Sequence, residues 1–211
     1  MTRGKFIALE GGEGAGKSTQ ARLLAAALEA RGIACVVTRE PGGTPGAEAI
    51  RALLLGTAGD GWHPRAEALL FAAARSDHVE RLIVPALEAG TWVICDRYVD
   101  SSRAYQGGGG GLSDADVLAL HRIGSQGLLP DLTLLIEVSA QTAAARALAR
   151  DGDAADRIGG RDAAYHAKVA AAFAGLAQAE PARFARIDGN GDSAAVHQTV
   201  LSALNPLLGA A

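Results

Sequence analysis

The chain has 211 residues, of which 49% are hydrophobic and 20% are charged, a composition typical of a folded globular domain and not of a disordered chain. Its 20 basic and 23 acidic residues give a net charge of −3, which excludes the broad positive field that non-specific nucleic-acid binding requires. We therefore expect no nucleic-acid partner, and any anionic ligand should be small and bound by a local cluster of positive groups.

Short apolar runs alternate with longer amphipathic stretches along the chain. The runs are typical of parallel strands covered on both faces, and they predict strands at residues 5–10, 34–39, 91–96, 131–138 and 183–188. The amphipathic stretches predict helices at residues 17–31, 45–55, 65–88, 113–126, 139–150, 162–179 and 193–207. The predicted fold class is therefore α/β, with a parallel five-stranded sheet flanked by helices in three layers.

Two segments interrupt this alternation. Residues 107–111 are five consecutive glycines, which we predict to form a loop because glycine weakens regular elements. Residues 150–162 are polar, contain glycine and carry charges of both signs, so we predict a mobile surface segment, or lid, at about 150–162. Since no Pro- or Ser-rich linker divides the chain, we expect residues 1–211 to form a single domain.

The apolar segments and the cysteines also indicate the cellular compartment of the protein. No apolar stretch approaches the ~18 residues of a membrane-spanning helix, and the first apolar run, residues 6–9, is too short for a signal peptide. Cys35 and Cys95 both lie in apolar runs, which is typical of buried, reduced thiols. We expect a cytoplasmic protein with no membrane partner.

The segment that begins at Gly11 and ends at Ser18 fits the pattern G-x-x-x-x-G-K-[ST] at every fixed position. A predicted strand precedes it and a predicted helix follows, which is the context of a phosphate-binding P-loop. Glycines let consecutive N–H groups surround phosphate oxygens, Lys17 can reach the β- and γ-phosphates, and the Ser18 hydroxyl can ligate Mg²⁺. We predict that a nucleoside triphosphate is bound by Gly11, Gly12, Glu13, Gly14, Ala15, Gly16, Lys17, Ser18 and Thr19.

A P-loop does not by itself identify the reaction. Switch GTPases read guanine through Asn-Lys-x-Asp, but Gly191 and Pro206 follow the two asparagines of this chain, Asn190 and Asn205. Motor ATPases and helicases are usually longer. A small phosphotransferase is the leading class. A kinase for another small acceptor and a nucleotide-dependent switch or binding module without phosphoryl transfer are the alternatives.

Asp96 and Arg97 come at the end of a predicted strand. Ligands of open α/β sheets bind beyond the carboxyl ends of the strands, so we expect both side chains near the P-loop. There the carboxylate can hold Mg²⁺ through water, and the guanidinium can bridge donor and acceptor phosphates. A purely structural ion pair is the alternative.

With these segments the chain resembles the bacterial thymidylate kinases that have a basic lid, over residues 6 to about 173. The most specific segments are Thr-Arg-Glu-Pro-Gly-Gly-Thr at 38–44 and Phe-Ala-Ala-Ala-Arg at 71–75. Further segments, in the family's order, are 50–51, 96–98, 101–107, 130–132 and 156–158. The resemblance implies a P-loop nucleoside monophosphate kinase that uses ATP and Mg²⁺ to phosphorylate dTMP to dTDP, with dUMP as an alternative acceptor, and that forms a homodimer.

The resemblance also implies how dTMP is bound. Phe71 is expected to stack on thymine, and Arg75, one helical turn away, to donate to a base carbonyl. Arg51 and Arg97 are expected to hold the dTMP phosphate. Arg39 either assists them or anchors its own loop.

Four further acceptor-side residues follow from the same resemblance. Glu40 is expected close to the acceptor nucleotide, and Tyr105 against the sugar, where a 2′-hydroxyl would be crowded. Ser102 and Gln106 are expected at the base edge.

Catalysis is expected to depend on Lys17, Arg97, Glu13 and a lid arginine, with Ser18 and Asp96 at the metal. Some members of the family carry a catalytic arginine within the P-loop. Because Gly12, Glu13, Gly14 and Ala15 include none here, the resemblance implies that the positive charge facing the γ-phosphoryl group comes from the lid. Its candidates are Arg150, Arg157 and Arg161, and Arg157 matches best. Glu13 is expected to pair with Arg97. The dTMP phosphate is already anionic, so no general base is needed, and we expect surface or packing positions for His63, His78, His121, His166 and His197.

Overall fold

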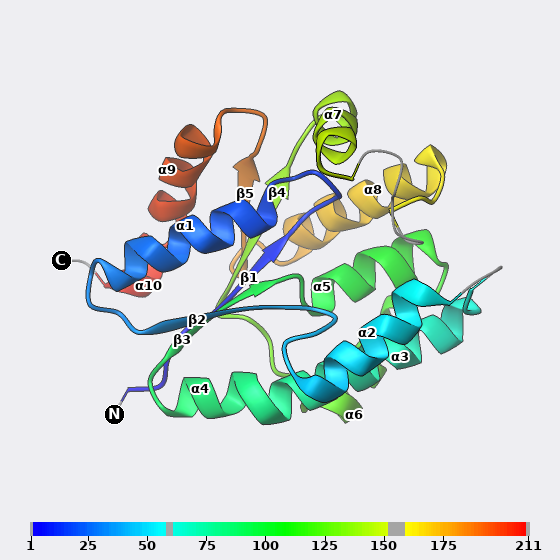
Figure 1. Ribbon diagram of the computed structural model, residues 1–211, viewed down its shortest axis with the longest axis horizontal. Coiled ribbons are helices and arrows are strands. Elements are labelled where there is room, and N and C mark those ends of the chain that lie inside the picture. The colour runs from blue at the N-terminus through cyan, green and yellow to red at the C-terminus, as the bar shows by residue number, and fades with distance from the viewer. Residues whose placement is uncertain (1, 58–60, 152–158, 210–211) are drawn as a thin grey trace.

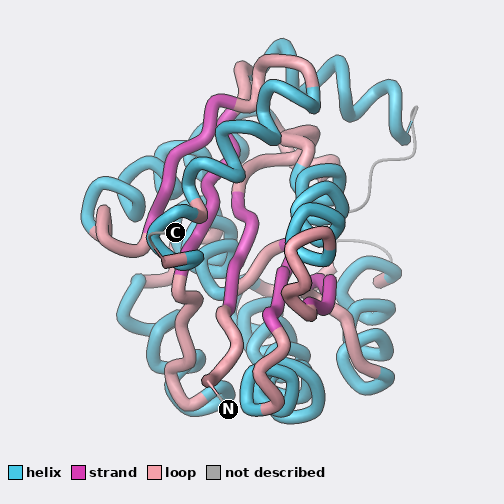
Figure 2. Tube along the Cα trace, turned by 90° about the vertical axis from the view of Figure 1, so that its left-hand side faces the viewer, coloured by secondary structure: helices cyan, strands magenta, loops and turns pink. Residues whose placement is uncertain are grey.

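Five parallel strands form the sheet of the computed structural model, which describes residues 2–57, 61–151 and 159–209. The strands are β1 (Phe6–Glu10), β2 (Cys35–Arg39), β3 (Trp92–Asp96), β4 (Leu132–Glu137) and β5 (Phe184–Asp188). Their order is β2-β3-β1-β4-β5, so β1 lies in the middle of the sheet, with helices on both sides (Figures 1 and 2). The predicted parallel five-stranded α/β fold is confirmed.

Apart from α5, where no helix was predicted, the helices lie close to their predicted positions. They are α1 (Lys17–Glu29), α2 (Pro45–Gly56), α3 (Pro64–His78), α4 (Val84–Glu88), α5 (Val99–Ser102), α6 (Asp114–Ser125), α7 (Ala140–Asp151), α8 (Ala163–Ala179), α9 (Ser193–Ala203) and α10 (Asn205–Leu208). A π-helical turn, η1 (Val79–Ile83), joins α3 to α4 just before Pro85, which has no N–H to donate. In the described part of the chain, none of these helices has the length and apolar character to span a bilayer.

Alternate residues of the central strand belong to two different apolar cores. Ile7 and Leu9 pack in one core with residues of α1 and α9, and Phe6 and Ala8 pack in the other with residues of η1 and α4. All four side chains are completely buried, because successive strand residues point to opposite faces and helices cover both. This is the coverage that the apolar runs predicted.

The edge strand β2 is covered less completely than predicted, because it has a neighbouring strand on one side alone. Val37 is 43% exposed, and Cys35 is partly exposed. The prediction that both thiols are buried is therefore wrong for Cys35 and confirmed for Cys95, which lies on β3 inside the sheet. Neither cysteine is in a disulfide.

The glycine run differs most from expectation. A second π-helical segment, η2, covers Arg103–Gly109, so the prediction of a loop is wrong for Gly107–Gly109. The small glycines let this segment pack closely on α8: a Cβ on Gly109 would lie 2.5 Å from the ring of Tyr165. The Tyr165 hydroxyl also donates to the Tyr105 carbonyl over 2.9 Å. Tertiary packing against α8 therefore supports a helical turn that glycine alone disfavours.

Candidate active site

The P-loop lies between β1 and α1, at the carboxyl end of the central strand (Figure 1). Gly11 has φ 137°, and a Cβ there would lie 2.3 Å from the Ile136 carbonyl oxygen of β4, so the loop accepts no side chain at this point. α1 begins at Lys17, as predicted, and its first N–H groups are directed at the loop. Lys17 Nζ donates to the carbonyl oxygens of Gly11 over 3.1 Å and Gly12 over 2.7 Å.

Burial makes Lys17 easier to deprotonate than an ordinary lysine. Desolvation, followed by the charge of Arg97, lowers the pKa of Lys17 to about 8, although Asp96 and Glu13 act in the opposite direction. An anionic ligand in the loop would favour the charged ammonium and reverse this shift. The charge of Lys17 is therefore sensitive to occupancy of the loop.

Asp96 and Ser18 meet beside the loop, as the position of Asp96 at a strand end predicted. Asp96 is in register with Leu9 on β1, and Ser18 Oγ donates to its carboxylate over 2.5 Å. A hydroxyl and a carboxylate are the hard oxygen donors that Mg²⁺ prefers, together with water and phosphate oxygens. Elsewhere in the described residues no group of three His, Cys, Asp or Glu side chains could hold a metal ion.

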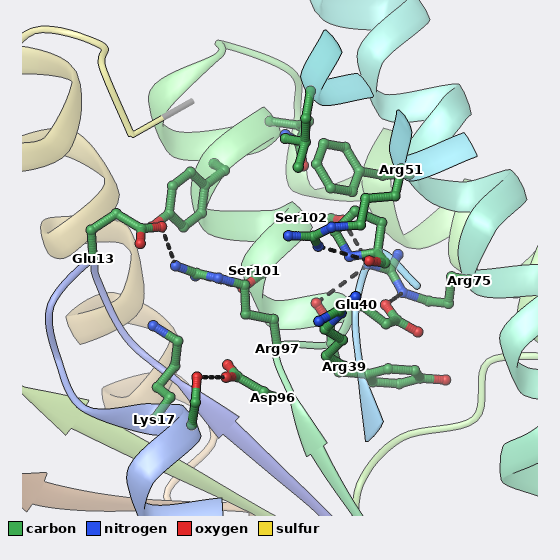
Figure 3. Close-up of a pocket in the computed structure, with 17 residues that line it drawn as sticks. Glu13, Lys17, Arg39, Glu40, Arg51, Arg75, Asp96, Arg97, Ser101 and Ser102 are labelled. Atoms are coloured by element: carbon green, nitrogen blue, oxygen red, sulfur yellow. Dashed lines mark hydrogen bonds and ion pairs between the residues drawn. The ribbon is translucent and has the colours of Figure 1, made fainter. Parts of the chain in front are cut away.

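Arg97 connects the P-loop to the segment after β3. Its backbone has φ 70°, and its guanidinium donates to Glu13 over 2.5 Å (Figure 3). It also donates to Ser101 Oγ over 3.2 Å and to the Gly11 carbonyl over 3.0 Å. The predicted pairing of Glu13 with Arg97 is confirmed. Burial by itself lowers the pKa of Arg97, but Tyr105, Glu13 and other acidic neighbours raise it on balance, so the positive charge is held firmly.

The sequence analysis missed Glu10, the last residue of β1. Its buried carboxylate accepts hydrogen bonds from the backbone N–H groups of Tyr98 (2.8 Å) and Ser101 (3.0 Å), and from Ser101 Oγ (2.6 Å). Burial and the nearby charge of Asp100 raise the pKa of Glu10 to about 7. Glu10 thereby fixes the turn that carries Arg97, and the one sequence signal for it was an acidic residue at the end of an apolar strand.

Phe71 and Arg75 border the same cleft as Lys17. Both come from α3, one turn apart as predicted, and Arg75 is buried. Arg75 lies across this cleft from Glu13 and Lys17 (Figure 3). The cleft has a volume of about 400 Å³, and its lining includes nearly all of the predicted acceptor-side and catalytic residues: Glu13, Lys17, Ser18, Glu40, Arg51, Phe71, Arg75, Asp96, Arg97, Ser102, Tyr105 and Gln106.

Arg75 is held by a chain of buried polar groups. Its Nε donates to Glu40 over 2.7 Å, and its Nη2 donates to Ser102 Oγ over 2.8 Å. The other oxygen of Glu40 contacts Nδ1 of His78 at 3.1 Å, and Nε2 of His78 contacts Thr38 Oγ1 at 2.7 Å. His78 is completely buried in helix packing, as predicted, but its contact with Glu40 was missed, and its spacing of three residues from Arg75 was the available signal.

The two other arginines of the acceptor side are held by loop contacts. Arg39 donates to Glu48 over 3.1 Å in an exposed ion pair, which is the contact expected if Arg39 anchors its own loop. Arg39 also borders the cleft. Arg51 Nη1 donates to the Pro41 carbonyl over 2.9 Å. The segment at 38–44 is thus tied to α2 through Arg39 and Pro41.

The η2 segment brings Tyr105 and Gln106 to the cleft. The guanidinium carbon of Arg97 lies 5.0 Å from the centre of the Tyr105 ring, within the range of a cation–π contact. Gln106 is buried, and its Nε2 donates to Glu67 of α3 over 3.0 Å. Glu67 was not among the predicted site residues, because its contact with Gln106 spans 39 residues of sequence.

The lid arginines are described in part. Arg157 lies outside the described residues, and only the backbone of Arg150, in α7, is described. Arg161 donates to Glu67 over 2.6 Å and is not part of the cleft lining. Arg146 of α7, which was not predicted, lies beside the P-loop, 3.9 Å from the position that a Cβ would take on Gly16.

These features define a class: an α/β protein whose P-loop, with the oxygens of Ser18 and Asp96 beside it, borders the same cleft as Phe71 and Arg75 of α3. The thymidylate kinase family model matches residues 9–200. The chain is 56% identical to the thymidylate kinase of Rhizorhabdus wittichii over 205 residues (97% of this chain, 99% of the relative). It is 48% identical to that of Nitrobacter winogradskyi over 204 residues (96% and 89%).

A solved structure agrees with the sequence relatives. The crystal structure of thymidylate kinase from Ehrlichia chaffeensis matches with a TM-score of 0.78 at 31% identity, covering 96% of this chain and 100% of that one. The chain belongs to the thymidylate kinase family. The resemblance seen in the sequence is therefore confirmed.

The lowered pKa of Lys17 gives a pH-dependent prediction. Below about pH 8 the Lys17 ammonium is charged in the free protein, whereas above it the neutral amine must take up a proton when the triphosphate binds, so affinity for ATP should fall as the pH rises through this value. Calorimetric titration with ATP above that pH should also show proton uptake. Lys17→Arg, which stays charged, is the control and should bind without this pH dependence. Wild-type affinity that is constant between about pH 8 and about pH 10 would contradict the assignment.

Proposed function

We propose that this enzyme transfers the γ-phosphoryl group of ATP to dTMP, producing dTDP, with Mg²⁺ as the cofactor. One observation carries the proposal: Phe71 and Arg75 border the same cleft as Lys17 and Arg97. A flat base and a triphosphate can then be held on opposite sides of one cavity, with the acceptor phosphate between them. Membership of the thymidylate kinase family supports this arrangement.

On the donor side, we assign the P-loop N–H groups and Lys17 to the β- and γ-phosphates of ATP. Ser18 and Asp96 would hold Mg²⁺, directly or through water, since their oxygens are 2.5 Å apart beside the loop. When bound, the ion would neutralise charge on the phosphate oxygens. The hydrogen bonds of Lys17 to Gly11 and Gly12 keep its ammonium at the loop before the nucleotide arrives.

On the acceptor side, we assign the dTMP phosphate to Arg51 and Arg97 and the base to Phe71 and Arg75. Arg75 is already oriented by Glu40 and Ser102, so little side-chain entropy would be lost when it donates to a base carbonyl. The remaining acceptor-side assignments follow the family resemblance: Tyr105 against the sugar, and Ser102 and Gln106 at the base edge.

Positioning and charge stabilisation suffice for the reaction. The acceptor oxygen of dTMP is anionic at neutral pH, so the enzyme needs to align it with the γ-phosphoryl and to neutralise the charge that develops there. Arg97, held by Glu13, is suited to lie between the two phosphates. Arg157 stays a prediction as the lid arginine, and Arg146 beside the P-loop is a second candidate.

The direct test is a panel of nucleoside monophosphates with ATP and Mg²⁺, read as ADP release. We expect turnover to require a monophosphate acceptor and Mg²⁺, and dTMP to give the highest kcat/KM. Turnover of ATP at the same rate without any acceptor would contradict the kinase assignment. A clear preference for dUMP or dCMP would keep the reaction class and replace the acceptor.

Phe71→Ala tests the base pocket. Loss of base stacking costs about 1–3 kcal/mol, so KM for dTMP should rise by about 5-fold to 150-fold, with KM for ATP changed less than about twofold. Because Phe71 also packs against the apolar core near Tyr105, Phe71→Leu is the matched control that keeps apolar volume but removes the aromatic face. Equal increases of the two KM values in both variants would place the base elsewhere.

The homodimer is also a proposal, supported by exposed apolar side chains on three adjacent helices. Leu53 of α2, Leu69 of α3 and Ile123 of α6 are 52%, 56% and 77% exposed, and large apolar groups in a shared surface favour association.

Sedimentation velocity should give a dimer for the wild type. Ile123→Glu, which places a charge on this surface, should shift it towards monomer, whereas the same substitution at the exposed Val37 on β2 should not.

A further inference from the structure

Glu67 is a buried carboxylate that contacts the cleft through another side chain. Its side chain is 2% exposed, and it is not part of the cleft lining. One oxygen accepts a hydrogen bond from Nε2 of Gln106 over 3.0 Å, and the other accepts from Nη2 of Arg161 over 2.6 Å. Gln106 itself borders the cleft.

The chemistry of these groups fixes which end of the Gln106 amide points away from the cleft. An ionised carboxylate accepts hydrogen bonds and donates none, and Glu67 forms an ion pair with Arg161. Glu67 therefore pairs with the amide nitrogen of Gln106 and not with its oxygen. The amide oxygen makes no contact with Glu67, and since Gln106 borders the cleft, this oxygen is the group of Gln106 that would accept a hydrogen bond from a ligand there.

The Glu67 carboxylate is itself held in place. Arg161 donates from Nη1 to the Tyr165 hydroxyl over 2.5 Å, and that hydroxyl donates to the Tyr105 carbonyl over 2.9 Å. A guanidinium has donors alone, so it must take an oxygen of residue 67. Glu67 therefore has one oxygen bound to Arg161 and the other bound to Gln106.

We propose that Glu67 is a specificity-determining residue, which orients the Gln106 amide so that the pocket accepts a hydrogen bond from the base at N3. Thymine and uracil carry a hydrogen at N3, whereas cytosine has an acceptor there, so the oriented oxygen selects against cytosine. This inference rests on the proposed function, in which the base lies beside Gln106. The selection is separate from that of Arg75, which donates to a base carbonyl.

Glu67→Gln tests the inference with a side chain of the same shape. In this variant Arg161 still requires an oxygen of residue 67, so the amide nitrogen of residue 67 faces Gln106. The Gln106 amide must then rotate by half a turn to offer its oxygen to that nitrogen. Its N–H₂ group is thereby presented to the cleft. The ratio of kcat/KM for dTMP to that for dCMP should then fall by about tenfold or more, because an N–H₂ group opposite N3–H leaves two donors facing each other. If turnover of dCMP is too slow, its inhibition constant against dTMP replaces kcat/KM.

Three controls separate orientation from structural damage. The ratio of dTMP to dUMP should not change in Glu67→Gln, since both bases carry N3–H. Glu180→Gln alters another paired carboxylate, which lies outside the cleft and forms ion pairs with Arg103 and Arg183. This variant should leave the ratio of kcat/KM for dTMP to that for dCMP unchanged. In a Gln106→Ala background, Glu67→Gln should have no further effect on that ratio.

The outcomes distinguish this inference from the proposed function. A wild type that uses dTMP and dCMP equally overturns both. A wild type that prefers dTMP, with a ratio unchanged by Glu67→Gln, overturns the role of Glu67 alone. Equal losses for dTMP, dUMP and dCMP in Glu67→Gln also overturn it, because they indicate structural damage without a change in base reading.

Discussion

The parallel alignment of β1 and β3 is the constraint on which the site depends. Because the two strands run side by side in the same direction, the P-loop after β1 and Arg97 after β3 emerge at one edge of the sheet. The ion pair of Arg97 with Glu13 and its bond to the Gly11 carbonyl then join the P-loop to the segment that follows β3. Neither segment could be displaced without breaking a contact with the other.

Buried charge gives the site its rigidity at a cost in stability. The pKa of Lys17 is lowered and that of Glu10 is raised because burial disfavours their charged forms. Arg75 with Glu40 and Glu67 with Arg161 are paired, and a buried charge that lost its partner would be strongly destabilising. These side chains are therefore confined to one arrangement before any ligand binds, which is the preorganisation that positioning catalysis requires.

Local patterns were sufficient to predict much of the fold and one part of the site. The ends of each predicted strand agree with the structure to within one residue, because the apolar runs are short and clearly bounded. The P-loop and the placement of Phe71 and Arg75 one turn apart on a helix were predictable because each depends on residues close in sequence, whose geometry the backbone period sets. The glycine run was predicted wrongly, since its helical form depends on contact with Tyr165 on a distant helix.

The sequence by itself determined the α/β alternation, the phosphate-binding loop and the family, all of which are written in short segments with fixed spacing. Only the tertiary structure decided that His78 contacts Glu40, that Glu10 holds the turn before Ser101, and that Glu67 orients Gln106. The physical reason is that a buried polar group must find a partner in three dimensions, and these partners lie 38, 91 and 39 residues away along the chain. A linear pattern carries no signal for such a pairing.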